Sequence, residues 1–170
     1  MIAMPGVMPP DKSSQSLRSC LGRFATGVVV VTFDSDEGRR GITVNSFTSV
    51  SMDPPLVLVS VARRARAHDA LFDRAFCVNV LGGEQEALAR RFAGSEGGGV
   101  AWTHHQDPPR LTGVLAHLEC SPWRAYNGGD HTLFIGEVVD YDYRDGDALA
   151  FHGSQFTRIA DEQLGIEYLL

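Results

Sequence analysis

Lysine is almost absent from this chain of 170 residues, which contains Lys12 as its single lysine beside fourteen arginines. Enzymes that form a lysine Schiff base, and P-loop proteins that hold phosphate with a lysine, are therefore nearly excluded. Basic side chains of both kinds are also outnumbered, since 15 Lys and Arg face 21 Asp and Glu for a net charge of -6. Sequence-independent binding to nucleic acid or to an anionic membrane needs an excess of basic surface. We expect neither partner, which leaves small molecules and proteins.

The chain also lacks paired cysteines and long apolar runs. Cys20, Cys77 and Cys120 form no CxxC motif, so neither a disulfide framework nor a zinc site is indicated, and the six histidines show no metal-binding spacing. The start, MIAMPGVMPPDKSSQ, lacks the basic and apolar segments of a signal peptide. No later run approaches the roughly 20 apolar residues that span a bilayer. We therefore expect a soluble, cytoplasmic protein without a metal.

With a hydrophobic share of 44%, the chain can bury one substantial core. We expect residues 1–15 to form a flexible leader and residues 16–170 to form a single domain. Apolar spacing predicts helices, and β-branched runs bounded by turn residues predict strands. The expected helices cover residues 13–24, 68–74 and 84–94, and the expected strands cover residues 27–33, 42–51, 55–62, 76–81, 111–120, 131–143 and 148–156. This pattern predicts a mainly β fold, a barrel with peripheral helices packed outside.

Hydroxyl and amide side chains are concentrated in the segment TVNSFTSVSMDPP, residues 43–55. One explanation is an ordinary strand with one face in water. The other explanation is a ligand site, and it is favoured by SVARRARAH, where arginines follow the next apolar run directly. Guanidinium groups suit phosphate because their planar donors meet several anionic oxygens. Such a site would suit a ligand with a flat body, a polar edge and a phosphate tail.

Several segments occur here in the order found in short-chain NAD(P)H:flavin reductases. They read FATGVVVVTF, GITVNSFTSVSMDPPLVLVSVA, HDAL, FCVNVL, ARRFAG and GDHTLFIGEV, and lie within residues 16–156. The chain resembles this family, which includes reductase components of two-component flavin-dependent monooxygenases. The resemblance implies an FMN-binding split β-barrel, usually a homodimer, that binds FMN or FAD and reduces flavin with NADH or NADPH.

The resemblance also gives the polar segment a role. Similar segments lay the isoalloxazine ring along the strand, where hydroxyl, amide and backbone groups meet its polar edge and the ribityl chain. Fixed hydrogen bonds at that edge orient the ring and adjust its potential. The implied flavin contacts are Asn45 and Ser46 first, then Thr43, Ser60, Val61 and Ala62, the last two through their backbone.

The turn after the expected strand at residues 55–62 departs from the family pattern. Relatives often carry Ser and Thr that help to hold phosphate where this chain has RARA at residues 64–67. We expect Arg63, Arg64 or Arg66 to take over by charge, or the flavin to be held loosely as a substrate that leaves after each turnover. His68 follows, either at a family position or as a packing histidine.

Two further motifs have both a structural and a functional interpretation. Arg91 and Phe92 in ARRFAG either close a helix with favourable charge and a core ring or, as the resemblance implies, contact the adenine or phosphate end of FAD. Asp130 and His131 begin a strand after a glycine turn. The matching histidine in relatives lies beside the nicotinamide, so the resemblance assigns His131 to positioning NAD(P)H and Asp130 to holding the turn. The pair His104–His105 is expected in a loop without function.

The implied reaction is hydride transfer from C4 of the nicotinamide to N5 of the flavin, with the reacting atoms roughly 3 to 3.5 Å apart. It requires no protein nucleophile, and the chain has no GxGxxG, so the nicotinamide binds without a Rossmann domain. The implied product is free reduced flavin for a separate monooxygenase or halogenase. Two alternatives remain, which are a non-catalytic flavin-binding redox sensor or carrier on the same barrel and a pyridoxamine-phosphate oxidase-like activity on a related barrel.

Overall fold

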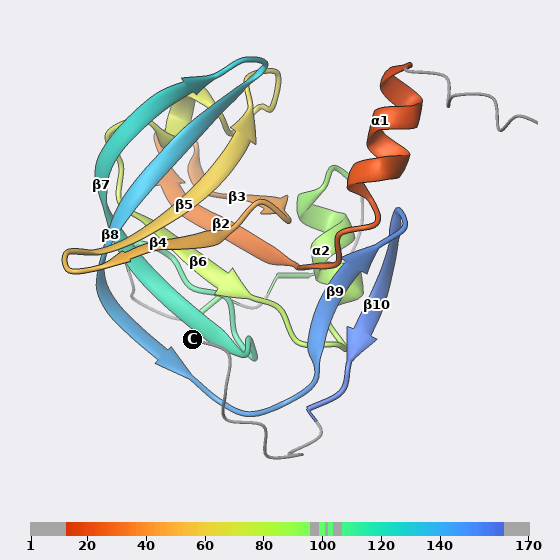
Figure 1. Ribbon diagram of the computed structural model, residues 1–170. Coiled ribbons are helices and arrows are strands. Elements are labelled where there is room, and N and C mark those ends of the chain that lie inside the picture. Colours follow the sequence, from red (N-terminus) through yellow and green to blue (C-terminus); the bar gives the residue numbers. More distant parts are fainter. Residues whose placement is uncertain (1–12, 96–98, 101, 104–106, 162–170) are drawn as a thin grey trace, which may run out of the picture.

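The computed structural model describes residues 13–95, 99–100, 102–103 and 107–161, and within them the fold is mainly β with few helices (Figure 1). The helices are α1 (Ser14–Leu21), the 3-10 helix η1 (Asp69–Leu71) and α2 (Glu86–Phe92). The strands are β1 (Thr26–Gly27), β2 (Val29–Ser35), β3 (Gly38–Val44), β4 (Thr48–Met52), β5 (Pro55–Ala62), β6 (Phe76–Val80), β7 (Ala116–Gly128), β8 (His131–Tyr143), β9 (Ala148–His152) and β10 (Gln155–Ile159).

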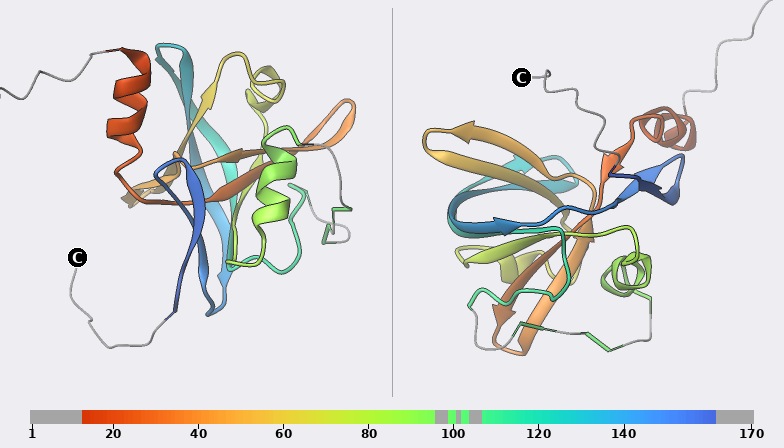
Figure 2. Two further views of the ribbon diagram at one scale, coloured as in Figure 1. Left: turned by 90° about the vertical axis from the view of Figure 1, so that its right-hand side faces the viewer. Right: turned by 90° about the horizontal axis from the view of Figure 1, so that it is seen from below.

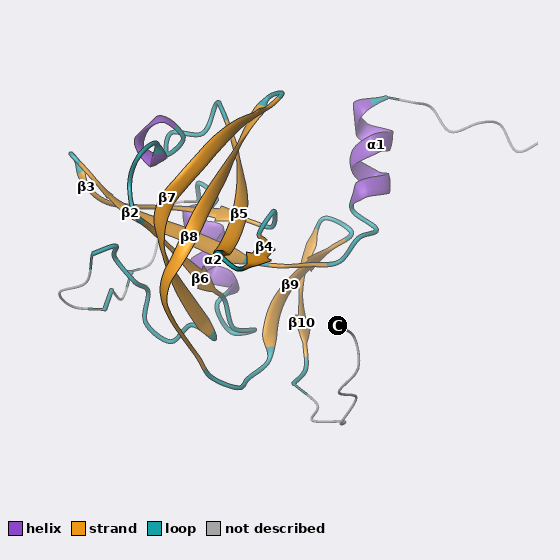
Figure 3. Ribbon diagram, turned by 60° about the vertical axis from the view of Figure 1, so that its left-hand side comes forward, coloured by secondary structure: helices purple, strands orange, loops and turns teal. Residues whose placement is uncertain are grey.

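Seven of these strands form one antiparallel sheet in the order β3-β2-β6-β7-β8-β5-β4. β3 and β4 lie at opposite ends of this order, yet residues 45–47 alone join them along the chain. The sheet must therefore curl until its two edges approach each other, as Figures 2 and 3 show. Among the described residues no ladder pairs β3 with β4, so the curled sheet stays open at this seam.

The apolar run at the start of the sheet is buried on both faces. Val29, Val31 and Phe33 point into the core cluster inside the curl. Val28 and Val30 point to the other face, into a second cluster beneath α2 and the three-stranded sheet β1-β9-β10. A strand covered on both faces reads as a continuous apolar run, which explains why GVVVVTF shows no alternation.

A buried amide anchors the segment that precedes β7. Asn79 in β6 donates to the Val30 carbonyl oxygen at 2.9 Å and to the Thr32 hydroxyl at 2.9 Å, and its Oδ1 accepts from the Leu111 N–H at 2.9 Å. Leu111 in turn forms an isolated β-bridge with Trp102. A buried amide that satisfies its donors and its acceptor fixes its neighbours firmly. Trp102 is thereby tied to the core.

Most of the expected elements are confirmed, and several boundaries are corrected. The expected strand at 42–51 breaks at residues 45–47, because the chain crosses there from one sheet edge to the other. The expected strand at 148–156 is the hairpin β9-β10, which turns through Gly153 at φ 56° and Ser154 at φ 66°. β7 continues to Gly128, beyond the expected 111–120, because a bulge accommodates its Pro122 region. Residues 68–74 contain only the single 3-10 turn η1.

Helix α1 stands away from the rest of the structure (Figure 1). The Ser13 side chain caps it by accepting from the Ser16 N–H at 3.2 Å. Its apolar side chains Leu17 and Leu21, and Phe24 just beyond it, are 59%, 65% and 78% exposed. Within this chain the apolar face of α1 is therefore left uncovered. No helix among the described residues is both long and apolar enough to cross a membrane.

Candidate functional site

Strand β5 extends past the strand that pairs with its outer edge. The ladder with β4 reaches only Leu58 in β5, where Thr48 is the partner. Ser46, just before β4, occupies the next position, since its hydroxyl donates to the Ser60 carbonyl oxygen and accepts from the Ser60 N–H, both at 2.9 Å. We call the region formed by Asn45, Ser46 and residues 59–62 the β5 edge.

Backbone directions decide which groups the β5 edge offers to a ligand. Residues along an antiparallel strand direct their N–H and C=O alternately to the two sides. The backbone of Ser60 points toward Ser46, so the N–H of Ala62, two residues on, points to the same open side. The backbone of Val61 points the other way, toward Thr132 in β8. The Ala62 carbonyl oxygen already accepts from the Ala65 N–H at 2.9 Å. Of the two expected backbone contacts, Ala62 is therefore better placed to meet a ligand acceptor than Val61.

The turn between β7 and β8 is fastened to the end of β5. The Arg63 N–H donates to the Asp130 carbonyl oxygen at 3.0 Å, and its guanidinium donates to Asn127 Oδ1 at 2.9 Å. His131 pairs with Ala62 across the ladder, and its Nδ1 lies 2.7 Å from Asp130 Oδ1. The hydrogen bond from His131, followed by the charge of its imidazole, lowers the pKa of Asp130. The structure thus brings a partly exposed imidazole beside the β5 edge.

The turn after β5 carries three exposed arginines, Arg63, Arg64 and Arg66. Arg63 is engaged with the β7-β8 turn as described, and the charge of Arg64 adds to the lowering of the Asp130 pKa. Within the described part of the chain, neither Arg64 nor Arg66 forms an ion pair with a carboxylate. Unneutralised guanidinium groups next to neutral donors suit a ligand with an anionic end.

His68 is buried beneath this turn, as the packing interpretation expects. Its Nε2 lies 2.8 Å from the Thr132 hydroxyl, and its Nδ1 lies 2.6 Å from Asp69 Oδ1. The ring also packs edge-on against Phe134, with centroids 5.7 Å apart. His68 therefore fastens the turn after β5 to Thr132 in β8, the residue that follows His131.

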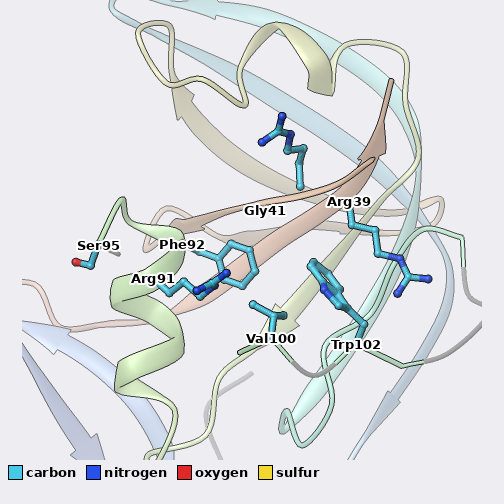
Figure 4. A pocket seen from close by; sticks show the side chains of 8 residues that line it. Arg39, Gly41, Arg91, Phe92, Ser95, Val100 and Trp102 are labelled. Atoms are coloured by element: carbon cyan, nitrogen blue, oxygen red, sulfur yellow. The ribbon is translucent and has the colours of Figure 1, made fainter. Parts of the chain in front are cut away.

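The remaining expected contacts lie at a second place, on the far side of β3. The Thr43 hydroxyl donates to the Ala89 carbonyl oxygen at 2.7 Å, so it holds β3 against α2. Arg91 and Phe92 end α2 and line a pocket of about 620 Å³ (Figure 4). Phe92 also packs on the second core cluster. The expected flavin residues thus form two groups joined by β3, one at the β5 edge and one at this pocket.

Sequence reasoning missed the other walls of the pocket. These walls are Arg39, Arg40, Gly41, Ser95, Val100 and Trp102. The arginines lie in DSDEGRRG, which reads as an ordinary polar hairpin turn, and Trp102 follows the glycine-rich loop. Only long-range packing brings these residues together. Trp102 is the one wall residue that the sequence could have singled out, because tryptophan is rare in this chain, which has two. The pair His104–His105 lies outside the described residues.

The thiols of the described core do not act as nucleophiles near neutral pH. Burial, and then the charge of Glu119, raise the pKa of Cys77 to about 12, and the same two causes raise that of Cys120 to about 12. The described residues also hold no group of three or more His, Cys, Asp or Glu that could bind a metal. The β5 edge offers backbone and side-chain donors beside the imidazole of His131, an arrangement suited to binding and orienting a polar-edged ring.

Comparisons with known proteins identify the family. Residues 21–160 match the family model of the flavin reductase like domain. The chain is 42% identical over 157 residues to the FMN reductase (NADH) SmoA of Agrobacterium fabrum, covering 90% of each protein. Other relatives include the reductase subunit HsaB of a flavin-dependent monooxygenase and the reductase component of a 4-nitrophenol monooxygenase, both from Rhodococcus species.

Solved structures give the same result. The NADH:FAD oxidoreductase SgcE6 of Streptomyces globisporus, in complex with NAD and FAD fragments, superposes with a TM-score of 0.84 at 40% identity, covering 94% of this chain and 99% of that one. BorF, the flavin reductase component of a bacterial two-component tryptophan halogenase, gives 0.82 at 38% identity, with coverages of 88% and 100%. On its sequence and its fold, this chain belongs to the flavin reductase like family.

Proposed function

We propose that this protein is an NADH:flavin oxidoreductase that reduces FAD or FMN and releases reduced flavin to a separate monooxygenase or halogenase. The observation that carries the proposal is the β5 edge, where an open strand edge lies beside His131 in a chain of this family. A relative such as BorF, which is the reductase component of a halogenase, supports the partner class.

The residues of the β5 edge fit a flavin ring. The acceptors on its polar edge need neutral donors, which the Ala62 N–H, the Asn45 amide and the Ser60 hydroxyl supply. Ser46 keeps these groups in place because both of its hydrogen bonds clamp the link to β5. Arg64 or Arg66 would meet the phosphate. When bound, the flavin supplies N5 as the acceptor of the hydride from C4 of the nicotinamide.

The protein's own contribution to the reaction is orientation. His131 pairs with Ala62 of the β5 edge, and Asp130 fixes its Nδ1, so that the imidazole is held beside the place where a nicotinamide would stack. Rigid positioning of two reactants lowers the entropic part of the barrier, and it needs no group that exchanges protons with the substrate. Arg63 and His68 hold the turn and the strand on either side of this position.

The oligomeric state, the fold and the compartment complete the proposal. The exposed apolar face of α1, formed by Leu17, Leu21 and Phe24, supports a homodimer in which a second copy covers it. The curled sheet, with edges joined through residues 45–47, favours a split barrel. Three free cysteines and the need for NADH favour the cytoplasm. We also propose that residues 16–170 act as one domain behind a short leader.

The decisive experiment follows NADH oxidation by purified protein, with FAD or FMN added in turn. The proposal predicts turnover that depends on added flavin and saturates with it, together with protein that leaves gel filtration largely free of flavin. If flavin stays bound through gel filtration and neither NADH nor NADPH reduces it, the protein is a flavin-binding sensor or carrier. That outcome would overturn the enzymatic proposal while leaving the binding site intact.

A further inference from the structure

We propose that His68 is a positioning residue, and that its hydrogen bond to Thr132 sets the place and orientation of His131 at the start of β8. The inference rests on the proposed function, which assigns the nicotinamide to His131. His68 itself is 6% exposed, too buried to touch either nucleotide. Its effect on the reaction therefore passes through the backbone of β8.

His131 occupies the least secured position of its strand. It is the first residue of β8, and its pairs with Ala62 and Gly128 are the terminal pairs of the β5-β8 and β7-β8 ladders. The turn before it contains Gly129 at φ 80°. Strand ends open more easily than strand centres. His131 therefore needs an anchor beyond its own ladder bonds.

A buried pair of side chains supplies this anchor. Thr132 is 4% exposed, and its hydroxyl oxygen lies 2.8 Å from Nε2 of His68. The contact between His131 and Asp130, in comparison, is exposed to water. A buried hydrogen bond is costly to leave unmade, so this one fixes the Thr132 side chain on the buried face. Successive side chains of a strand point to opposite faces, so His131 is directed to the open face.

Both ring nitrogens of His68 are engaged, which gives the anchor a single orientation. Nδ1 lies 2.6 Å from Asp69 Oδ1, and because an ionised carboxylate only accepts, we assign a proton to Nδ1. In the neutral ring Nε2 is then an acceptor, and the Thr132 hydroxyl donates to it. The ring also packs edge-on against Phe72 and Phe134, at centroid distances of 5.3 and 5.7 Å. An imidazole held on all these sides can pass a fixed position to β8.

Two substitutions of His68 separate the hydrogen bond from the packing. Glutamine carries its amide about as far from the backbone as histidine carries Nε2, whereas the amide of asparagine ends near the position of Nδ1. H68Q should therefore keep the bond to Thr132 and H68N should lose it, while both lose the same ring contacts. With saturating NADH and protein in excess over flavin, the rate constant of anaerobic flavin reduction should fall about ten-fold in H68N, and H68Q should recover most of it. Unfolded protein would lower the amplitude and not the rate constant.

Thr132 provides the matched pair on the other side of the bond. T132V removes the hydroxyl and should slow flavin reduction as H68N does, whereas T132S keeps the hydroxyl and should restore the rate. The double variant H68N/T132V should be no slower than either single variant, because both substitutions remove the same bond. The dissociation constant of the flavin should stay unchanged in all of these variants.

NMR follows the orientation of His131 without turnover. Its imidazole C2–H resonance is the one that H131A lacks, and this resonance should shift in H68N and T132V but stay in place in H68Q and T132S. If the wild type fails to reduce flavin while the resonance behaves in this way, the reductase proposal fails and the positioning role stands. If H68N and H68Q behave alike in both measurements, or T132V matches the wild type in both, His68 only packs and the inference is overturned.

Discussion

Replacing Ser46 by alanine tests the β5 edge most simply, because one hydroxyl holds the link between the two sheet edges. S46A removes a hydrogen bond to the Ser60 carbonyl oxygen and another from the Ser60 N–H, both at 2.9 Å. At about 1 kcal/mol for each bond, the free energy of unfolding should fall by about 2 kcal/mol. That loss corresponds to a decrease of roughly 30-fold in the folding equilibrium constant.

Urea denaturation measures this loss directly. With a slope of about 2 kcal/mol/M, typical of small proteins, the midpoint of S46A should fall by about 1 M. Flavin affinity, measured far below the midpoint, should fall as well, because Asn45 loses its fixed backbone while its side chain is unchanged.

The matched control is S49A, three residues further along. Ser49 is exposed in β4, and its hydroxyl makes no hydrogen bond within the described residues. Its replacement should change the free energy of unfolding by at most about 0.5 kcal/mol. If S46A and S49A behave alike in both stability and flavin binding, then the link at residues 45–47 is not held by Ser46 and the description of the β5 edge is wrong.

Four other predictions follow from the geometry. H131A should slow NADH oxidation at least ten-fold with flavin affinity retained, because the role proposed for the imidazole is to position the nicotinamide and not to hold the flavin; equal loss of both would remove its assigned role. G41A should lower the free energy of unfolding by about 1 to 3 kcal/mol through overpacking, since the new Cβ would lie 2.7 Å from an aromatic ring, and a urea midpoint equal to the wild type would contradict this contact. At pH 8 a thiol reagent should modify Cys20 alone in the native protein, because Cys77 and Cys120 are buried with pKa values raised to about 12. The same raised values mean that the unfolded state loses these protons first, so stability should fall as pH rises above about 9; fast native labelling of all three would refute the burial.

Local sequence signals predicted the strands better than their connections. β5 and β8 have the predicted bounds, because alternating or continuous apolar runs between turn residues mark strands directly. The crossing at residues 45–47 could not be predicted in the same way, since it depends on which strands pair and on the curl of the whole sheet. The Ser46 to Ser60 clamp is likewise visible only once the two edges meet.

The two halves of the candidate site differ in how far sequence reveals them. Asn45, Ser46 and His131 lie in motifs that resemble a known family, so they were predicted from short segments. Arg39 and Trp102 come from a polar turn and from a segment after a loop, and only packing around α2 brings them together. Arg39 and Trp102 are far apart in the sequence, so no local pattern predicts the contact between them.

The central claim is that this protein transfers hydride from NADH to flavin, and an anaerobic single-turnover experiment tests it most directly. The protein is mixed with oxidised flavin and then with NADH in the absence of oxygen, while the visible absorbance of the flavin is followed. One hydride carries two electrons, so the account predicts that one flavin is fully bleached for each NADH consumed, at a rate that H131A lowers. Flavin that stays oxidised in the presence of excess NADH would contradict the account.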